Sequence, residues 1–142
     1  MRLGNLIYGC SLALLLGTSA AAQQSPLIGT WTSAFNLNTP AVIYLTLNIR
    51  PDGQLQEKLM NRQGVAYELL GTYEFDAAKG VFQFIFTDYQ PKQLCSPLGC
   101  QPAPVPPDQL NIKNTAQVTF PNANQMIGKA ADGSTMIWGR VN

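Results

Sequence analysis

The chain has 142 residues, a formal net charge of +1 and charged side chains at only 12% of its positions. No basic patch or run of like charge occurs along it, which excludes the cationic surface that nucleic-acid binding needs and a polybasic membrane anchor. The sequence contains no histidine, which excludes Ser-His-Asp and Cys-His catalytic groups and removes the commonest zinc ligand.

Residues 1–22 have the features of a bacterial signal peptide. An arginine near the start is followed by a short apolar run at 12–16, and Ala20 and Ala22 have the Ala-x-Ala spacing that signal peptidase recognises. The apolar run is much shorter than the roughly 20 residues of a membrane-spanning helix, which disfavours a retained anchor. We expect cleavage after Ala22 and export of residues 23–142 to the periplasm or the medium, as one domain that does not insert into a membrane.

After the leader, turn signals alternate with stretches rich in apolar, β-branched and aromatic residues. Residues 50–53 (RPDG) favour a turn, and Asp132-Gly133 is typical of a two-residue hairpin. This pattern predicts antiparallel strands joined in chain order, and hence an all-β protein with a single antiparallel up-and-down β-barrel of about eight strands. The expected strands are 29–35, 42–50, 54–60, 65–75, 81–88, 109–119, 125–130 and 134–141.

Several expected strands alternate apolar and polar residues, as in a sheet with one buried and one solvated face. Each has an apolar set that shares one face. These sets are Ile43, Leu45, Leu47 and Ile49; Tyr67, Leu69, Gly71, Tyr73 and Phe75; Phe82, Phe84 and Phe86; and Leu110, Ile112, Ala116, Val118 and Phe120. We expect these faces to line the inside of the barrel.

Residues 89–108 form the longest expected loop, which is rich in proline and contains Cys95 and Cys100. Cys10 leaves with the leader, and the remaining pair in an exported protein indicates one disulfide. The C-x4-C spacing differs from the C-x-x-C of thiol oxidoreductases. We therefore expect the bond to fix the shape of the loop tip, with a stabilisation at the low end of roughly 2–4 kcal/mol.

Acidic residues are the remaining source of acid–base chemistry. Six of the eight acidic residues could converge in space as paired carboxylates: Glu57, Glu68, Glu74, Asp76, Asp88 and Asp108. We expect most of them at turns or on solvated faces, where they form an ordinary hydrophilic surface. The sequence has no glycine-rich phosphate loop and no Asp-x-Asp calcium motif. We therefore expect no catalytic residue, no metal, no cofactor and no enzymatic activity.

Three short motifs resemble the lipocalins and the wider calycin group. Gly29-Thr30-Trp31 (GTW) stands at the start of the first expected strand, where that family has Gly-x-Trp. Arg140 lies on the last strand, like the family arginine that packs over the tryptophan and closes one barrel end. Residues 87–89 (TDY) match a tripeptide of the family, displaced here to the end of the fifth strand. The resemblance implies a ligand-carrying barrel in which Gly29, Trp31 and Arg140 hold the fold.

Our leading hypothesis is a non-enzymatic barrel that binds a small apolar ligand such as a lipid or fatty acid. The candidate ligand contacts are Leu45, Leu47, Tyr67, Leu69, Tyr73, Phe82, Phe84 and Phe86, which would equally serve to fill a solid barrel. In the alternative hypothesis the barrel is filled, and the stiff loop at 92–104 binds a protein, for example a secreted protease. A third hypothesis is an envelope protein with no separable activity.

Overall fold

The computed structural model describes residues 24–64, 66–103 and 109–142. The expected signal peptide and its cleavage site lie outside the described residues, as does the last part of the proline-rich segment, which includes Asp108. Among the described residues, no helix is long and apolar enough to cross a membrane.

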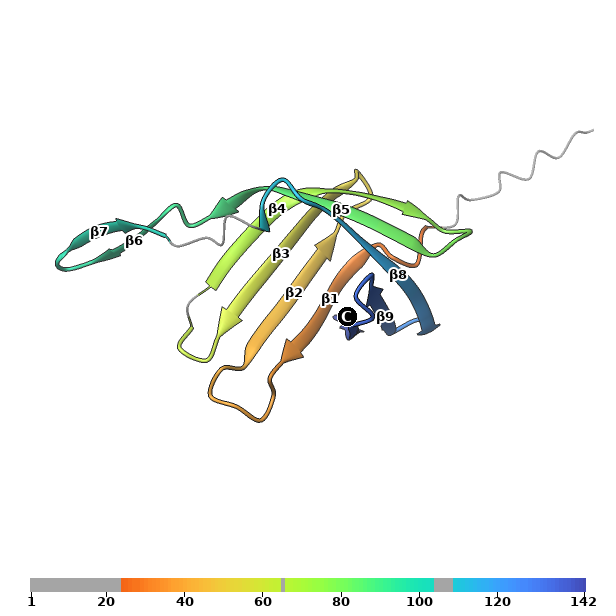
Figure 1. Cartoon of the computed structure of the whole chain (residues 1–142), viewed down its shortest axis with the longest axis horizontal. Coiled ribbons are helices and arrows are strands. Elements are labelled where there is room, and N and C mark those ends of the chain that lie inside the picture. The colour runs from red at the N-terminus through yellow and green to blue at the C-terminus, as the bar shows by residue number, and fades with distance from the viewer. Residues whose placement is uncertain (1–23, 65, 104–108) are drawn as a thin grey trace, which may run out of the picture.

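A closed barrel of antiparallel strands forms the body of the molecule (Figure 1). In the described part of the chain the strands are β1 (Gly29–Phe35), β2 (Ile43–Ile49), β3 (Gln54–Asn61), β4 (Ala66–Asp76), β5 (Val81–Gln90), β6 (Gln93–Ser96), β7 (Gly99–Pro102), β8 (Lys113–Asn122), β9 (Gln125–Ala130) and β10 (Thr135–Arg140). The order around the barrel is β1-β10-β9-β8-β5-β4-β3-β2, so chain neighbours pair throughout except where β6 and β7 intervene. The prediction of an all-β, up-and-down barrel of eight strands is confirmed.

The inner faces follow the predicted alternation. On β2, Leu45, Leu47 and Ile49 are buried, and on β5 Phe82 and Phe86 are buried. Leu47 of β2 lies directly opposite Glu57 of β3, and Glu57 lies directly opposite Leu69 of β4. The strand register therefore places these three residues on the same, inner face of the sheet. These apolar side chains form one hydrophobic core inside the barrel.

A β-bulge interrupts the pairing of β4 with β5. The register shifts between Leu70 and Gly71, which leaves Thr87 as an extra residue on β5 between Phe86 and Asp88. A Cβ atom on Gly71 would lie 2.0 Å from the carbonyl oxygen of Ile85. The bulge brings the two backbones so close that no residue other than glycine fits at position 71 without displacement.

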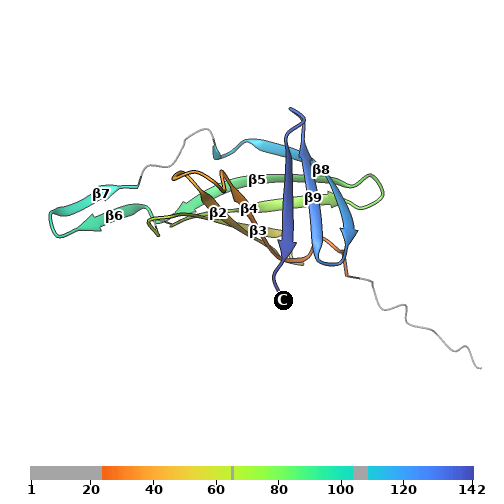
Figure 2. The same ribbon diagram turned by 90° about the horizontal axis from the view of Figure 1, so that it is seen from below.

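The proline-rich segment differs from the expected unstructured loop. Its strands β6 and β7 form a separate two-stranded hairpin in which Cys95 is directly opposite Cys100. Figure 2 shows this hairpin projecting well clear of the barrel beyond the end of β5. The expectation of a loop was wrong here because the flanking prolines obscured two four-residue strands, which the Cys95–Cys100 bond clamps together.

The strand expected at 109–119 also begins later than predicted, at Lys113. Asn111 has a left-handed backbone conformation with a φ of 61°, and its N–H donates to the carbonyl of Phe86 at 2.7 Å. This turn reorients the chain, so Ile112 is exposed and does not join the inner face of β8.

Candidate functional site

One end of the barrel is closed by Trp31 and Arg140. Trp31 is fully buried, and its indole N–H donates to the carbonyl of Leu27 at 2.9 Å. The guanidinium carbon of Arg140 lies 4.2 Å from the centre of the Trp31 ring, a cation–π contact. The guanidinium also donates to the carbonyl oxygens of Pro26 at 2.7 Å, Ile28 at 2.8 Å and Ala123 at 2.8 Å.

Gly29 belongs to the same closed end. Its φ is +140°, and a Cβ atom there would lie 2.5 Å from Nη1 of Arg140. The absence of a side chain therefore leaves room for the guanidinium over the ring. Gly29, Trp31 and Arg140, singled out from the sequence as closure residues, thus lie in direct proximity and form the plug at this end.

A cavity of about 240 Å³ lies inside the barrel. Its wall is mainly apolar, and every barrel strand except β4 contributes to it. The inner-face contributors are Leu47 of β2, Leu55 and Glu57 of β3, Phe82 and Phe84 of β5, Ala116 and Val118 of β8, Met126 and Gly128 of β9, and Met136 and Trp138 of β10. The barrel is therefore not filled solid by its own side chains.

The cavity reaches the surface beside the seam between β1 and β10. The ladder between these strands covers only Trp31 and Thr32 of β1, and beyond it the Ser33 hydroxyl donates to the carbonyl of Ile137 at 2.7 Å. Phe35 and Thr135, which line the cavity at this end, are exposed. We call this opening the mouth; it lies at the end of the barrel opposite the Trp31–Arg140 plug.

Glu57 is the one ionisable side chain in the described wall of the cavity. It lies between the apolar inner-face residues Leu55 and Leu59, and its cross-strand neighbours are Leu47 and Leu69. Burial in this apolar wall raises the pKa of the Glu57 carboxyl to about 7. Among the described residues, no hydrogen bond or ion pair reaches its carboxylate.

Sequence analysis did not distinguish Glu57 from the carboxylates expected on the surface, whereas the structure places it in the wall of the cavity. The signal that would have found it is the alternation of Leu55, Glu57 and Leu59, which puts the carboxylate on the same face as two leucines. The expected outer position holds for Glu68, which accepts from Gln56 at 3.1 Å and lies 3.8 Å from Lys58.

The eight candidate ligand contacts divide into three groups. Leu47, Phe82 and Phe84 line the cavity. The second group, Leu45, Leu69 and Phe86, is buried in the core beside it. The third group, Tyr67 and Tyr73, is half-buried, and the Tyr73 hydroxyl donates to the carbonyl of Arg50 at 2.6 Å.

Sequence reasoning missed much of the wall contributed by the last two strands. Met126, Gly128, Met136 and Trp138 line the cavity, but their short strands were not assigned to faces. The alternation of Met136 with Trp138, and of Met126 with Gly128, was the available signal.

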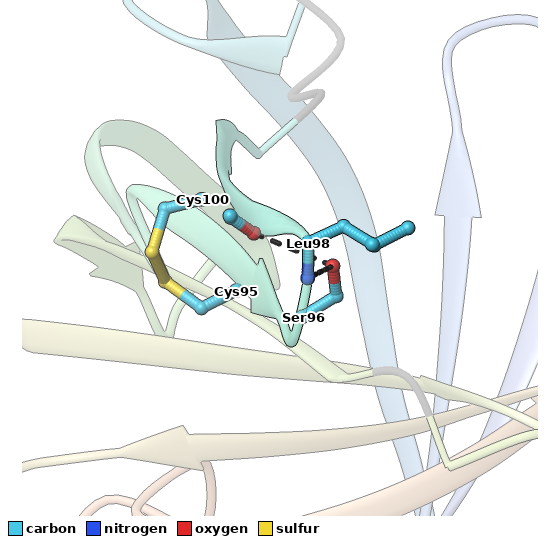
Figure 3. The surroundings of a disulfide bond; sticks show 5 residues. Cys95, Ser96, Leu98 and Cys100 are labelled. Carbon is cyan, nitrogen blue, oxygen red and sulfur yellow. Dashed lines mark hydrogen bonds between the residues drawn. A yellow bond between two sulfur atoms is a disulfide. The ribbon is translucent and has the colours of Figure 1, made fainter.

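The disulfide predicted between Cys95 and Cys100 is confirmed, with the two Cα atoms 4.0 Å apart. It clamps the hairpin directly behind its tip (Figure 3). The Ser96 hydroxyl accepts from the N–H of Leu98 at 3.2 Å and orders the turn. The Leu98 side chain points away from the disulfide and is 100% exposed.

Asp88 of the TDY tripeptide organises the chain where it leaves the barrel for the hairpin. It accepts from the side chain of Lys92 and from the N–H of Tyr89, and these hydrogen bonds, that of Lys92 first, lower the pKa of its carboxyl. The Lys92 ammonium also lies 3.7 Å from the centre of the Tyr89 ring. In this chain, then, TDY orders the base of the hairpin.

In the described part of the chain, no group of three or more histidine, cysteine, aspartate or glutamate side chains is arranged to hold a metal ion. Comparison of the chain with protein-family models finds no match, and comparison with curated proteins finds none either.

Proposed function

We propose that this protein is an exported, lipocalin-like barrel that binds a small, mainly apolar molecule in its internal cavity and carries out no catalysis. The single observation that carries the proposal is the apolar cavity of about 240 Å³ with a mouth beside the β1–β10 seam. Well-packed interiors have few voids larger than a water molecule, so a cavity of this size needs an explanation beyond imperfect packing.

The lipocalin resemblance is supported by the contact of Arg140 with Trp31 and by the closed barrel of eight strands. In a barrel plugged at one end, a ligand enters from the other. The mouth beside Phe35 lies at the end opposite the plug and would serve as this entrance. We infer from the signal peptide expected at 1–22 that the protein acts in the periplasm or outside the cell, where a carrier or scavenger of small molecules has access to its ligand.

The size of the cavity limits the ligand. A cavity of about 150 Å³ holds benzene, and sites for drug-sized ligands occupy about 300–1,000 Å³. The space here, about 240 Å³, suits one ring with a short chain, or the end of an acyl chain whose remainder leaves through the mouth. A whole fatty acid of ordinary length would not be enclosed.

The test is binding of propylbenzene, a small apolar probe, to the protein purified from its native compartment. Trp138 lines the cavity, so we expect saturable binding to shift tryptophan emission. Gly128 also lines the cavity, and a Cβ atom added to it would meet no other atom within 4 Å. Gly128→Leu should therefore fill the space without unfolding the barrel.

Gly139→Leu is the matched control for the filled cavity. Gly139 lies on the neighbouring strand β10, where it is exposed and equally free of close neighbours. We expect Gly139→Leu to bind propylbenzene as the original protein does, and Gly128→Leu to bind at least about tenfold more weakly. Unchanged binding in Gly128→Leu, or no saturable binding by the original protein, would contradict the proposal. Native mass spectrometry of the same preparation would reveal a ligand that copurifies.

A second candidate function is protein recognition through the hairpin in residues 92–104, and the exposed Leu98 favours it. Leu94 is 40% exposed and Leu98 100% exposed, on a disulfide-clamped hairpin away from the barrel. Apolar side chains on a pre-organised loop lose little conformational entropy when they dock. Capture of a partner from the same compartment by the original protein, but not by Leu98→Ser, would support this function; equal capture by both would count against it.

A further inference from the structure

We propose that Glu57 selects the ligand, and that the ligand carries a positively charged nitrogen, an amine on a small apolar body, which donates a hydrogen bond to the Glu57 carboxylate. This inference rests on the proposed function, because it takes the cavity to be the ligand site. It narrows the ligand from an apolar molecule in general to an amphipathic cation, and it disfavours a free fatty acid.

The position of Glu57 in the cavity wall supports this inference. Its side chain occupies an inner-face position of β3, with Leu47 on one side and Leu69 on the other. Among the described residues, every fully buried side-chain oxygen has a hydrogen-bond partner, whereas the Glu57 carboxylate has none. The carboxylate is therefore not fully buried. The carboxylate oxygens therefore remain accessible to a small molecule within the cavity that Glu57 lines.

The free-energy cost of an unpaired carboxyl group in an apolar wall also supports this inference. A carboxyl group in an apolar wall loses hydration without gaining a hydrogen bond, which destabilises the folded protein. A leucine at position 57, like its neighbours Leu55 and Leu59, would avoid that cost. A ligand that supplies the missing donor offsets the cost, and a cationic donor makes the stronger, charge-assisted bond.

The absence of positive charge on the described wall of the cavity also favours a cationic ligand. Asn114 and Trp138, on other parts of its wall, are neutral. On the strands that flank Glu57, the inner face offers apolar residues from β2, and Tyr67 and Tyr73 as titratable groups from β4. The charged pair of Lys58 and Glu68 is on the outside of the barrel.

No described cation of the protein thus competes for Glu57, and burial alone accounts for its raised pKa. The ammonium group of a ligand could therefore pair with the Glu57 carboxylate without displacing another partner. A bound carboxylate would instead place two acids in one apolar cavity, where one of them must hold a proton.

The experiment compares three probes of similar size on the intact protein: 2-phenylethylamine, 3-phenylpropionate and uncharged propylbenzene. Binding is followed by tryptophan emission and by calorimetry. At about pH 8 we expect the amine to bind at least about tenfold more tightly than the acid, as a charge-assisted hydrogen bond requires. The amine stays protonated at this pH.

Two variants assign the preference to Glu57. Glu57→Gln keeps the shape of the side chain and removes its charge, and we expect it to abolish the preference for the amine while propylbenzene binding remains. Glu74→Gln removes one negative charge from the exposed face of β4 and should leave the preference unchanged. A preference that persists in Glu57→Gln would overturn the inference.

A pH series on the unmodified protein gives an independent measure. As pH rises through the raised pKa of Glu57, about 7, the carboxyl loses its proton and amine affinity should rise about tenfold. An affinity that does not change between about pH 5.5 and 8 would overturn the inference.

The outcomes separate the two proposals. If propylbenzene binds but the amine has no advantage over the acid, the amine inference fails and the apolar cavity remains the proposed ligand site. If none of the three probes binds, the proposed function fails and the inference fails with it.

Discussion

Arg140 and Trp31 face each other across the seam where the last strand of the barrel meets the first. They are direct register partners on β10 and β1, and the guanidinium carbon lies 4.2 Å from the centre of the indole ring. Because the same guanidinium holds carbonyl groups of the segment before β1 and of the β8–β9 turn, one side chain joins three parts of the chain. The ladder between β1 and β10 is short, so this contact has a large share in closing the barrel.

Arg140→Ala should therefore weaken the whole barrel. It removes the cation–π contact and leaves three carbonyl groups without their charged donor, so we expect the free energy of unfolding to fall by about 2–3 kcal/mol. Arg140→Lys should recover only part of this, because an ammonium cannot reproduce the planar fork of donors. Urea denaturation followed by tryptophan emission measures both. Arg62→Ala, at an exposed turn, is the control and should change little; an equal loss in that variant would contradict this account.

Gly71→Ala should be among the most damaging conservative substitutions in the chain. The added Cβ would lie 2.0 Å from the carbonyl oxygen of Ile85, so β4 and β5 must separate at the bulge. We expect a loss of about 2 kcal/mol or more in the free energy of unfolding. Gly139→Ala, which meets no atom within 4 Å, serves as the control in the same denaturation series. Similar stability in the two variants would show that the bulge relaxes easily.

Much of the barrel was predictable because its strands alternate clearly. On β2 and β5, apolar residues at every second position indicated both the strands and their inner faces, and the structure buries most of them as expected. The start of β8 was not predictable in this way. Leu110 and Ile112 continue the alternation, but Asn111 adopts a left-handed conformation that ends any strand, and no local pattern distinguishes it.

The candidate site was less predictable than the fold. Whether a barrel is filled or hollow depends on the summed volumes of side chains from nearly all of its strands, and no single strand carries that information. Glu57 is different, since its place between Leu55 and Leu59 was visible in the sequence. It was missed because a charged residue was assumed to be solvated, whereas its strand parity should have taken precedence.

Breaking the disulfide should affect the hairpin and leave the barrel intact. Strands β6 and β7 pair only with each other, outside the barrel sheet, and their residues are exposed. We expect a Cys95→Ser, Cys100→Ser double variant to lose less than about 1 kcal/mol in barrel stability, while amide hydrogens of the hairpin exchange faster. Urea denaturation and hydrogen exchange test the two halves of this prediction. A loss of several kcal/mol would mean that the hairpin unfolds together with the barrel.

Glu57 should also make the ligand-free protein less stable as pH rises. Its pKa is raised from 4.5 to about 7 in the folded state, so folding favours the protonated carboxyl. The stabilising effect is fully present below the unfolded-state value and is lost as pH rises through the folded-state value. From about pH 4.5 to above about pH 7, the free energy of unfolding should fall by about 2–3 kcal/mol on account of this group.

Glu57→Gln isolates that contribution, because an amide of the same shape has no proton to lose. We expect the variant to be more stable than the original protein at about pH 8 and close to it at about pH 4.5, with the difference developing between those values. Urea denaturation at a series of pH values measures it, and Glu74→Gln, on the outer face, should leave the profile of the original protein unchanged. Parallel profiles for the original protein and Glu57→Gln would mean that the Glu57 carboxyl is solvated in the folded state. A saturating amine ligand should reverse the trend, since it binds the deprotonated form and so stabilises the protein most where the empty protein is weakest.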